Sequence, residues 1–215
     1  MFDVDGTLID SYDLDSACFI EAVEEVSGIQ LDPDWSGYRH VTDSGILNEV
    51  LGSIQSGEAD RIKNEIRLIF IEKLRRSIRD HPIREIPGAA SFIASLKERD
   101  DLLVSIATGG WRESALLKLS SAGIDISSIP LATSSDRVSR VEIMRYAEQQ
   151  ATGGKAMPCI YFGDAWWDRE ACRQLGYSFV LVGNKFTHTP AIQSYRSAED
   201  VLALLGSHRK GRFHT

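Results

Sequence analysis

The sequence lacks the features of a membrane-spanning or disulfide-bonded protein. It contains no run of about 18 apolar residues, and its first residues lack the basic and apolar regions of a signal peptide. Only three cysteines occur in 215 residues, Cys18, Cys159 and Cys172, and they lie in apolar stretches. Such cysteines are typical of buried thiols in a reducing compartment. These absences predict a cytoplasmic protein without membrane segments.

Positive charge is also scarce. The chain has 24 Lys and Arg against 31 Asp and Glu, which gives a formal net charge of -7. This balance argues against nucleic acid or an anionic membrane as a partner, because both attract basic surfaces. An anionic substrate must therefore be held by local cations or by a metal ion.

The second half of the sequence alternates apolar runs with helical stretches. Strands are predicted at 102–107, 130–133, 159–163 and 178–182, and helices at 89–97, 110–123, 165–175 and 197–205. This alternation is typical of an α/β fold with a central parallel sheet flanked by helices. In such a fold, binding and catalytic groups gather at the carboxyl ends of the strands.

Residues 12–85 show a different pattern, with helical periodicity and no strand-like runs. Apolar positions predict helices around 14–26, 46–51 and 62–74, and Gly28 and Gly52 follow the first two. The sequence therefore predicts a small, all-helical insert at 12–85. The catalytic core would be discontinuous and would comprise 1–11 and 86–215.

Asp3 and Asp5 are the most informative residues of the chain. Side chains two positions apart share a face of an extended strand, so both carboxylates can reach one substrate. Gly6 then allows a sharp turn, and Thr7 can hold it. This pattern predicts one nucleophile and one proton-transfer group. Taken alone, it fits a calcium loop or a solvated turn equally well.

Three further segments carry candidate functional groups. Thr108 and Gly109 follow the apolar run 102–107, and Asp164 and Asp168 follow the run 159–163. Arg140 begins an amphipathic helix, where free N–H groups also favour phosphate. Individually these residues fit an ordinary turn, a helix cap or a solvated helix start. Together they indicate a phosphate site with a hard cation.

In this order, the four segments resemble the motifs of the haloacid dehalogenase superfamily, and the likeness spans the whole chain. It is closest in character to the phosphatase branch that includes phosphoglycolate phosphatases and carries a helical cap of the C1 type. The resemblance implies a Rossmann-like core with the helical insert as a cap. It also implies that the cap closes over the core, which favours a small phosphorylated metabolite as substrate.

The resemblance also implies roles for individual residues. Asp3 is the nucleophile, Asp5 the general acid and base, and Thr108 a phosphate-binding hydroxyl with Gly109 beside it. The implied cofactor is Mg²⁺, held by Asp3, the Asp5 carbonyl and Asp164, with Asp168 nearby. Since dehalogenases of the family lack an acid at the position of Asp5, a phosphatase or a phosphomutase remains.

Arg140 departs from the family pattern, which usually has lysine there. Its guanidinium keeps the charge and can bind phosphate through two donors. Lys155 and Arg137 are rivals for the role, although Lys155 is expected at the far edge of the sheet. Trp166 and Trp167 are also unusual beside the metal-binding aspartates. One is expected to pack beneath the cap, and packing is favoured over the alternative that the other faces the substrate.

Arg39 and His40 lie in the polar stretch before the second predicted helix of the cap. They are candidates to recognise the non-phosphate end of the substrate, whereas Thr42 or Asp43 is more simply a helix N-cap. Only Met1 and Phe2 precede Asp3, although a buried central strand usually has about five residues. We therefore expect either a short first strand or a start that is placed too late.

The sequence thus predicts a Mg²⁺-dependent phosphatase that acts on a small phosphomonoester. A sugar-phosphate phosphomutase is the nearest alternative. A catalytically weak protein that retains the fold for binding or regulation is a further one, because Arg140 and the short first strand depart from the family pattern.

Overall fold

The computed structural model describes residues 1–197 and 201. Its main sheet is parallel and contains β3 (Ile106–Ala107), β4 (Leu131–Ala132), β5 (Ile160–Gly163), β6 (Ser178–Val182) and β7 (Ala191–Ile192). Phe2 forms parallel bridges to Ile106 and to Phe162, so the start of the chain lies between β3 and β5. The order across the sheet is therefore β4, β3, the segment around Phe2, β5, β6 and β7.

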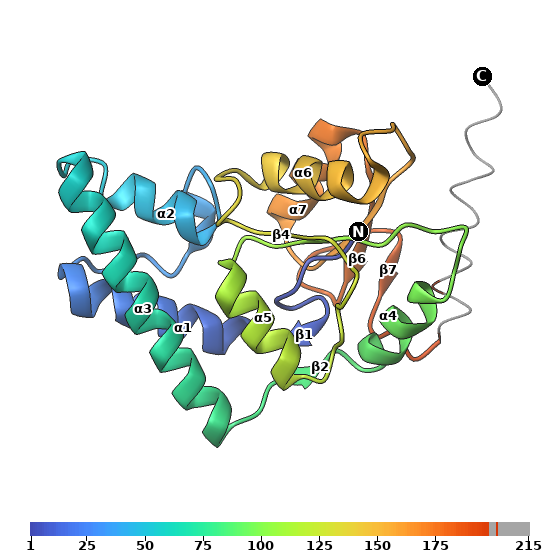
Figure 1. The fold of residues 1–215 in the computed structure, drawn as a ribbon, viewed down its shortest axis with the longest axis horizontal. Helices are drawn as coiled ribbons and strands as arrows, with labels where there is room; N and C mark the ends of the chain where they lie inside the picture. The colour runs from blue at the N-terminus through green and yellow to red at the C-terminus, as the bar shows by residue number, and fades with distance from the viewer. Residues whose placement is uncertain (198–200, 202–215) are drawn as a thin grey trace.

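The two faces of this sheet are covered by helices, as Figure 1 shows. α4 (Ala89–Lys97) and α5 (Arg112–Ser121) lie below it in that view, and α6 (Arg140–Thr152) and α7 (Trp166–Leu175) lie above. The alternation along β6 explains the layers, because Val180 packs into the cluster with α4 and α5, whereas Phe179 and Leu181 pack into the cluster with α6 and α7. The predicted α/β fold with a parallel sheet is confirmed.

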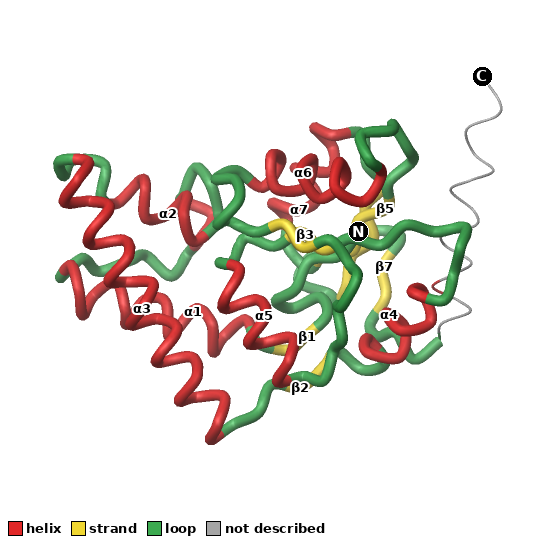
Figure 2. The backbone as a smooth tube through the Cα atoms, viewed as in Figure 1, coloured by secondary structure: helices red, strands yellow, loops and turns green. Residues whose placement is uncertain are grey.

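The strands differ in length from the prediction. β6 has the predicted bounds, but β3 begins only at Ile106, and residues 102–105 of the predicted strand are not in regular structure. Figure 2 shows long loops on either side of these short strands. The helix predicted over 197–205 lies largely outside the described residues.

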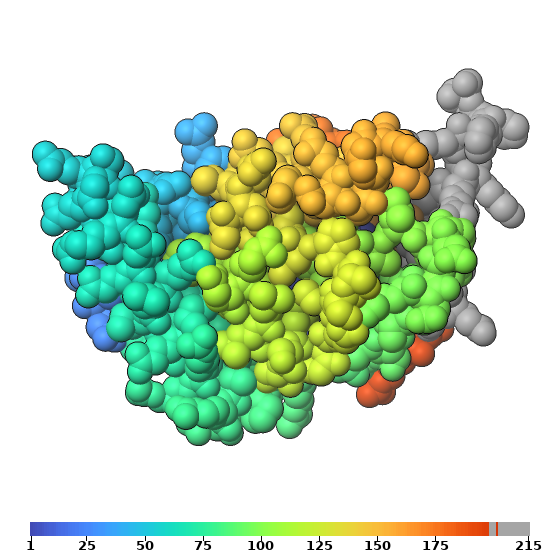
Figure 3. Space-filling model, in the orientation of Figure 1, coloured from blue at the N-terminus to red at the C-terminus, as the bar shows by residue number. Residues whose placement is uncertain are grey.

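Helices α1 (Tyr12–Ser27), α2 (Asp43–Val50) and α3 (Ser56–Asp80) lie together on one side of the molecule, with a 3-10 turn η1 (Trp35–Gly37) between the first two. They enclose a separate apolar cluster in which Phe19, Leu47 and Phe70 are buried. Trp111, from the start of α5, packs into the same cluster and joins the helices to the sheet side. Figure 3 shows the helical part in direct contact with the rest of the molecule on the face drawn.

A two-stranded antiparallel ribbon lies where the chain enters and leaves these helices. β1 (Ile9–Asp10) pairs with β2 (Arg84–Glu85), with Ile9 opposite Glu85. The sequence did not predict this ribbon. Within the described residues, no helix is long and apolar enough to cross a membrane.

Candidate active site

Asp3 lies at the carboxyl end of the central segment and is 4% exposed. Its N–H donates to the carbonyl oxygen of Phe162 at 2.9 Å, which ties the residue to β5. The chain then turns at Gly6, whose φ is +73°. A Cβ at Gly6 would lie only 2.2 Å from Oδ2 of Asp164, so the turn needs glycine for both its conformation and its space.

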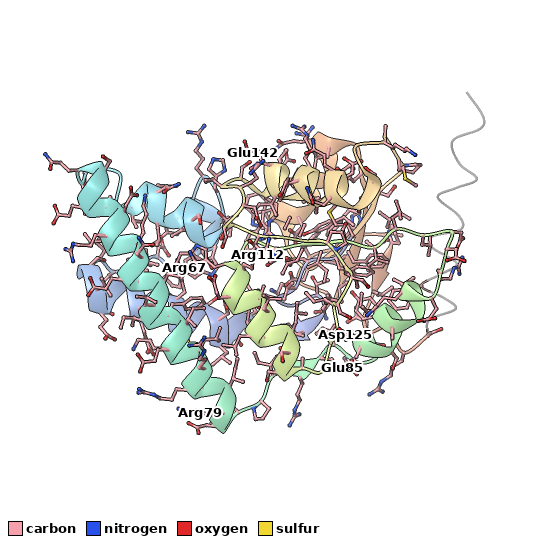
Figure 4. All side chains as sticks on the ribbon, in the orientation of Figure 1. Arg67, Arg79, Glu85, Arg112, Asp125 and Glu142 are labelled. Atoms are coloured by element: carbon pink, nitrogen blue, oxygen red, sulfur yellow. The ribbon has the colours of Figure 1, made fainter. Side chains whose placement is uncertain are left out.

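Arg140 reaches Asp3 from the first turn of α6. A capping box between Ser139 and Glu142 fixes the start of this helix, and Glu142 is labelled there in Figure 4. Nη1 of Arg140 donates to Oδ1 of Asp3 at 3.1 Å, and Nε lies 3.4 Å from Oδ1 of Asp168. Arg140 therefore places a cation directly beside the carboxylate of Asp3.

The two rivals of Arg140 lie elsewhere. Arg137 is exposed, donates to the carbonyl oxygen of Asp136 and stacks its guanidinium over Tyr146 at 4.6 Å from the ring centroid. Lys155 is exposed in the loop before β5. Of these three cations, Arg140 is the one that contacts Asp3.

Asp164 and Asp168 complete a cluster of carboxylates with Asp3. One oxygen of each lies within 4.8 Å of those of the other two. Burial raises the pKa of Asp3, partly offset by Arg140, and burial also raises the pKa of Asp168 to about 6. Oxygen donors alone suit Mg²⁺, and a divalent cation would offset the surplus of negative charge. These three residues therefore fit a magnesium site.

Lys185 contacts this cluster and was missed by sequence reasoning. Its Nζ lies 2.5 Å from Oδ2 of Asp164 and 3.8 Å from the ring centroid of Tyr12. Burial raises the pKa of Asp164, and Lys185 counteracts that rise. Nothing in the sequence marked Lys185, because it follows β6 in a loop without a recognisable pattern.

Lys118 is a second residue that sequence reasoning missed. It is fully buried on α5, and its Nζ lies 2.6 Å from Oδ1 of Asp5 and 2.5 Å from Oδ1 of Asp15. Ser11 also donates to Oδ1 of Asp5 at 2.5 Å. Burial alone would lower the pKa of Lys118, but Asp15 and Asp5 raise it, so the lysine stays charged. A signal existed, since Lys118 falls on the buried face of α5 next to Leu119.

A cavity of about 80 Å³ opens above Asp3. Thr108, Gly109 and the Asp5 side chain line its sheet side, and residues of α1 and α2 line the other. Thr108 is buried, and its Oγ1 accepts a hydrogen bond from the N–H of Gly110 at 3.3 Å. The structure thus brings Asp3, Asp5, Thr108, Gly109, Arg140 and Asp164 to one cavity, with Asp168 directly behind it.

Arg39 and His40, which are candidates to recognise the substrate, do not line this cavity. Arg39 is exposed, and the Cβ of His40 packs close to Gly45 at the start of α2. Thr42 is the N-cap of α2, as its sequence suggested, and accepts a hydrogen bond from the N–H of Gly45. The polar stretch therefore serves to start α2, and its last residues, Val41, Thr42 and Asp43, line the cavity.

The two tryptophans of the metal loop point to different surroundings. Trp167 lines the cavity and packs against the cluster of the helical part, whereas Trp166 is 48% exposed. Packing beneath the helices, predicted for one of the pair, applies to Trp167.

Comparison with known proteins gives one family and many structures. The model of the haloacid dehalogenase-like hydrolases matches residues 1–182. A search of curated proteins gave no match. A hydrolase from Pseudomonas syringae is 23% identical, with 96% of each chain covered and a TM-score of 0.67.

Two further solved structures are similar at lower identity. β-Phosphoglucomutase from Clostridium difficile is 17% identical over 97% of this chain and 96% of its own, with a TM-score of 0.73. The HAD-hydrolase YfnB from Bacillus subtilis is 17% identical over 95% of this chain and 96% of its own, with a TM-score of 0.56. At these identities, the structures establish a shared fold.

Proposed function

Since this chain belongs to the haloacid dehalogenase-like hydrolases, we propose that it is a Mg²⁺-dependent phosphatase of a small phosphomonoester. One observation carries the proposal: Asp3 is buried in the cavity with Arg140 at 3.1 Å and Asp5 two residues further along. A nucleophile, a phosphate-binding cation and a proton-transfer group therefore share one small cavity.

The first step breaks the ester bond. A carboxylate oxygen of Asp3 attacks phosphorus and forms an aspartyl-phosphate, while the bond from phosphorus to the ester oxygen breaks. Asp5 donates a proton to the departing alkoxide. Arg140 and the hydroxyl of Thr108 bind the phosphoryl oxygens and stabilise the charge that develops on them.

The second step returns the enzyme to its starting state. Asp5 accepts a proton from water as the water oxygen attacks phosphorus, and the bond to Asp3 breaks to release inorganic phosphate. Asp3, Asp164, Asp168 and the Asp5 carbonyl would hold Mg²⁺, which supplies positive charge against the repulsion between carboxylate and phosphate. The neighbour from Bacillus subtilis is described as bound to magnesium, which supports this cofactor.

Helices α1–α3 act as a cap in this proposal. They form the far side of the cavity, and their own apolar cluster lets them move as a unit. Closure would exclude water from the aspartyl-phosphate until the alcohol has left. The description of the Bacillus subtilis structure mentions interdomain movement, which supports a mobile cap.

A phosphomutase is the nearest alternative, because one similar structure is a β-phosphoglucomutase. The two reactions differ in what becomes of the phosphoryl group, because a hydrolase passes it to water and a mutase returns it to the sugar. A mutase would also need an activating bisphosphate, which a hydrolase does not.

Phosphate release from a panel of phosphorylated metabolites tests the proposal. With Mg²⁺ we expect turnover of at least one short phosphomonoester, and with EDTA we expect none. Turnover that persists in EDTA would contradict the dependence on Mg²⁺. Sugar-phosphate isomerisation that depends on added bisphosphate, without net phosphate release, would favour the mutase.

A further inference from the structure

One acid in the cavity has no cationic partner among the described residues. Five aspartates line the cavity: Asp3, Asp5, Asp15, Asp43 and Asp164. Four of them pair with cations: Asp3 with Arg140, Asp5 and Asp15 with Lys118, and Asp164 with Lys185. Asp43 is the exception.

Asp43 is held firmly at the start of α2. Its N–H donates to the carbonyl oxygen of Gly109 at 2.9 Å, and its Oδ2 accepts from the N–H of Trp111 at 2.8 Å. Its other oxygen, Oδ1, accepts no hydrogen bond from any described residue, although Asp43 is only 8% exposed. Oδ1 is open to the cavity rather than sealed from it, so an ammonium group that enters the cavity can donate to it.

The surroundings of Asp43 favour a positive ligand over a neutral one. Burial raises the pKa of Asp43 well above its usual range, and the negative charge of Asp15 raises it further, while Lys118 and the N–H of Trp111 offset part of the rise. A nearby cation would stabilise the charged form of both acids.

Aromatic rings line the same cavity: Phe19, Trp35 and Trp167, and also Tyr12, whose ring already contacts Lys185. The faces of such rings attract ammonium groups, and carboxylates beside them add direct pairing. A carboxylate on the substrate would instead be repelled by Asp43. Lys118, Arg140 and Lys185 already pair with other aspartates of the cavity, so none of them is left to bind it.

We infer that Asp43 binds an ammonium group at the non-phosphate end of the substrate, which makes the substrate a short phosphomonoester of an amino alcohol. The phosphate end of this assignment rests on the proposed function. The ammonium end rests on the free oxygen of Asp43 and the aromatic lining. Asp43 thereby sets specificity and takes no part in the bond cleavage itself.

Equilibrium binding of three phosphonates of similar size tests the inference without turnover. They are 2-aminoethylphosphonate, 2-hydroxyethylphosphonate and phosphonoacetate, titrated calorimetrically into the full chain with Mg²⁺. We expect the amino compound to bind at least about tenfold more tightly than either of the others, as charge-assisted hydrogen bonds allow. Equal binding of the amino and hydroxyl compounds, or tighter binding of phosphonoacetate, would overturn it.

The variant Asp43→Asn removes the charge but keeps an oxygen for the N–H of Trp111. We expect it to lose the preference for the amino compound while its melting temperature stays near that of the wild type. Asp60→Asn is the matched control, because Asp60 is an exposed acid of α3 away from the cavity, and it should keep the preference. A preference that survives in Asp43→Asn would show that another group selects the ammonium.

Failure of the inference and failure of the proposed function give different results. If phosphate is released from short esters but the phosphonate preference is absent, the phosphatase stands and the role of Asp43 falls. If the preference is present but no ester is hydrolysed, the ammonium site stands and the phosphatase falls.

Discussion

The sheet side and the helical side of the cavity are built in different ways. Asp3, Thr108 and Asp164 each follow a strand of one parallel sheet, so a single architectural rule brings them together. Asp15 and Asp43 belong to α1 and α2, and they reach the cavity through contacts with Lys118, Gly109 and Trp111. In the proposed function the first side carries the chemistry, and in the inferred ammonium site the second carries selection and positioning.

This difference predicts unequal effects of substitution, and Asp3 should give the largest. Asp3→Asn keeps the shape of the side chain but cannot form the aspartyl-phosphate, so turnover should fall by at least about 10³-fold. Because Asp3 is buried with a raised pKa, the neutral amide should not lower the melting temperature. Phosphate release and thermal melting measure the two effects. Turnover within tenfold of the wild type would show that the sheet side does not supply the nucleophile.

Arg140 should give the next largest effect. Arg140→Ala should lose at least about a hundredfold in turnover, since removal of one such donor from a dry site commonly costs that much. Arg140→Lys should recover much of the loss, because an ammonium can bind the same oxygens.

Arg137→Ala and Lys155→Ala are the matched controls for Arg140, since both residues are exposed cations away from Asp3. They should remain active. If Arg137→Ala abolished turnover and Arg140→Ala retained it, the phosphate-binding residue would be Arg137, one helical turn earlier along the chain.

Lys118 tests whether the helical side also supports the chemistry. Lys118→Met leaves Asp5 and Asp15 buried without a cation, and loss of one member of a buried pair typically costs about 3–5 kcal/mol. A displaced Asp5 should also slow alkyl phosphates more than aryl phosphates, because only the alkoxide needs a proton.

Urea unfolding and a comparison of the two ester types measure these effects of Lys118. Lys97→Met, which breaks an exposed pair with Asp125, is the control and should change stability by less than about 1 kcal/mol. Equal slowing of both ester types would reduce Lys118 to a purely structural residue.

The response to pH separates metal binding from folding. Burial raises the pKa of Asp168 from 3.8 to about 6, so the folded state holds this proton more tightly. The contribution of Asp168 to stability is present below pH 3.8 and is lost as the pH rises through about 6. Mg²⁺ needs the charged carboxylate and should therefore raise the melting temperature at pH 7.5 and have little effect at pH 5. A rise of equal size at both values would contradict a site formed by these aspartates.

The smallest effects should come from the part of the helical side that faces solvent. Arg39→Ala and His40→Ala should each change turnover by less than about twofold, because neither side chain lines the cavity. Steady-state kinetics on the best substrate of the panel provides the measurement. A larger loss would mean that this stretch moves into the cavity during the reaction cycle.

Much of the fold was predictable from local patterns. The bounds of β6 and of α4 follow from an apolar run and from Pro87-Gly88 before a helical stretch. α1 ends at Gly28 as predicted, and the structure shows this glycine in the left-handed conformation. The length of β3 was not predictable, because apolar residues before Ile106 pack without joining the sheet. The β1–β2 ribbon was missed because each strand has only two residues, too few for a period to show.

The sequence by itself determined the family, the parallel sheet and the residues at its carboxyl edge. Strand periodicity, turn chemistry and short motifs are local properties. Because parallel strands end at the same edge of the sheet, the residues that follow them lie close together. Only the tertiary structure decided that Lys118 joins Asp5 to Asp15, residues 113 and 103 positions away, and that Asp43 meets Gly109 and Trp111. These pairings depend on how helices α1, α2 and α5 dock on one another, and that docking is set by packing of whole apolar faces.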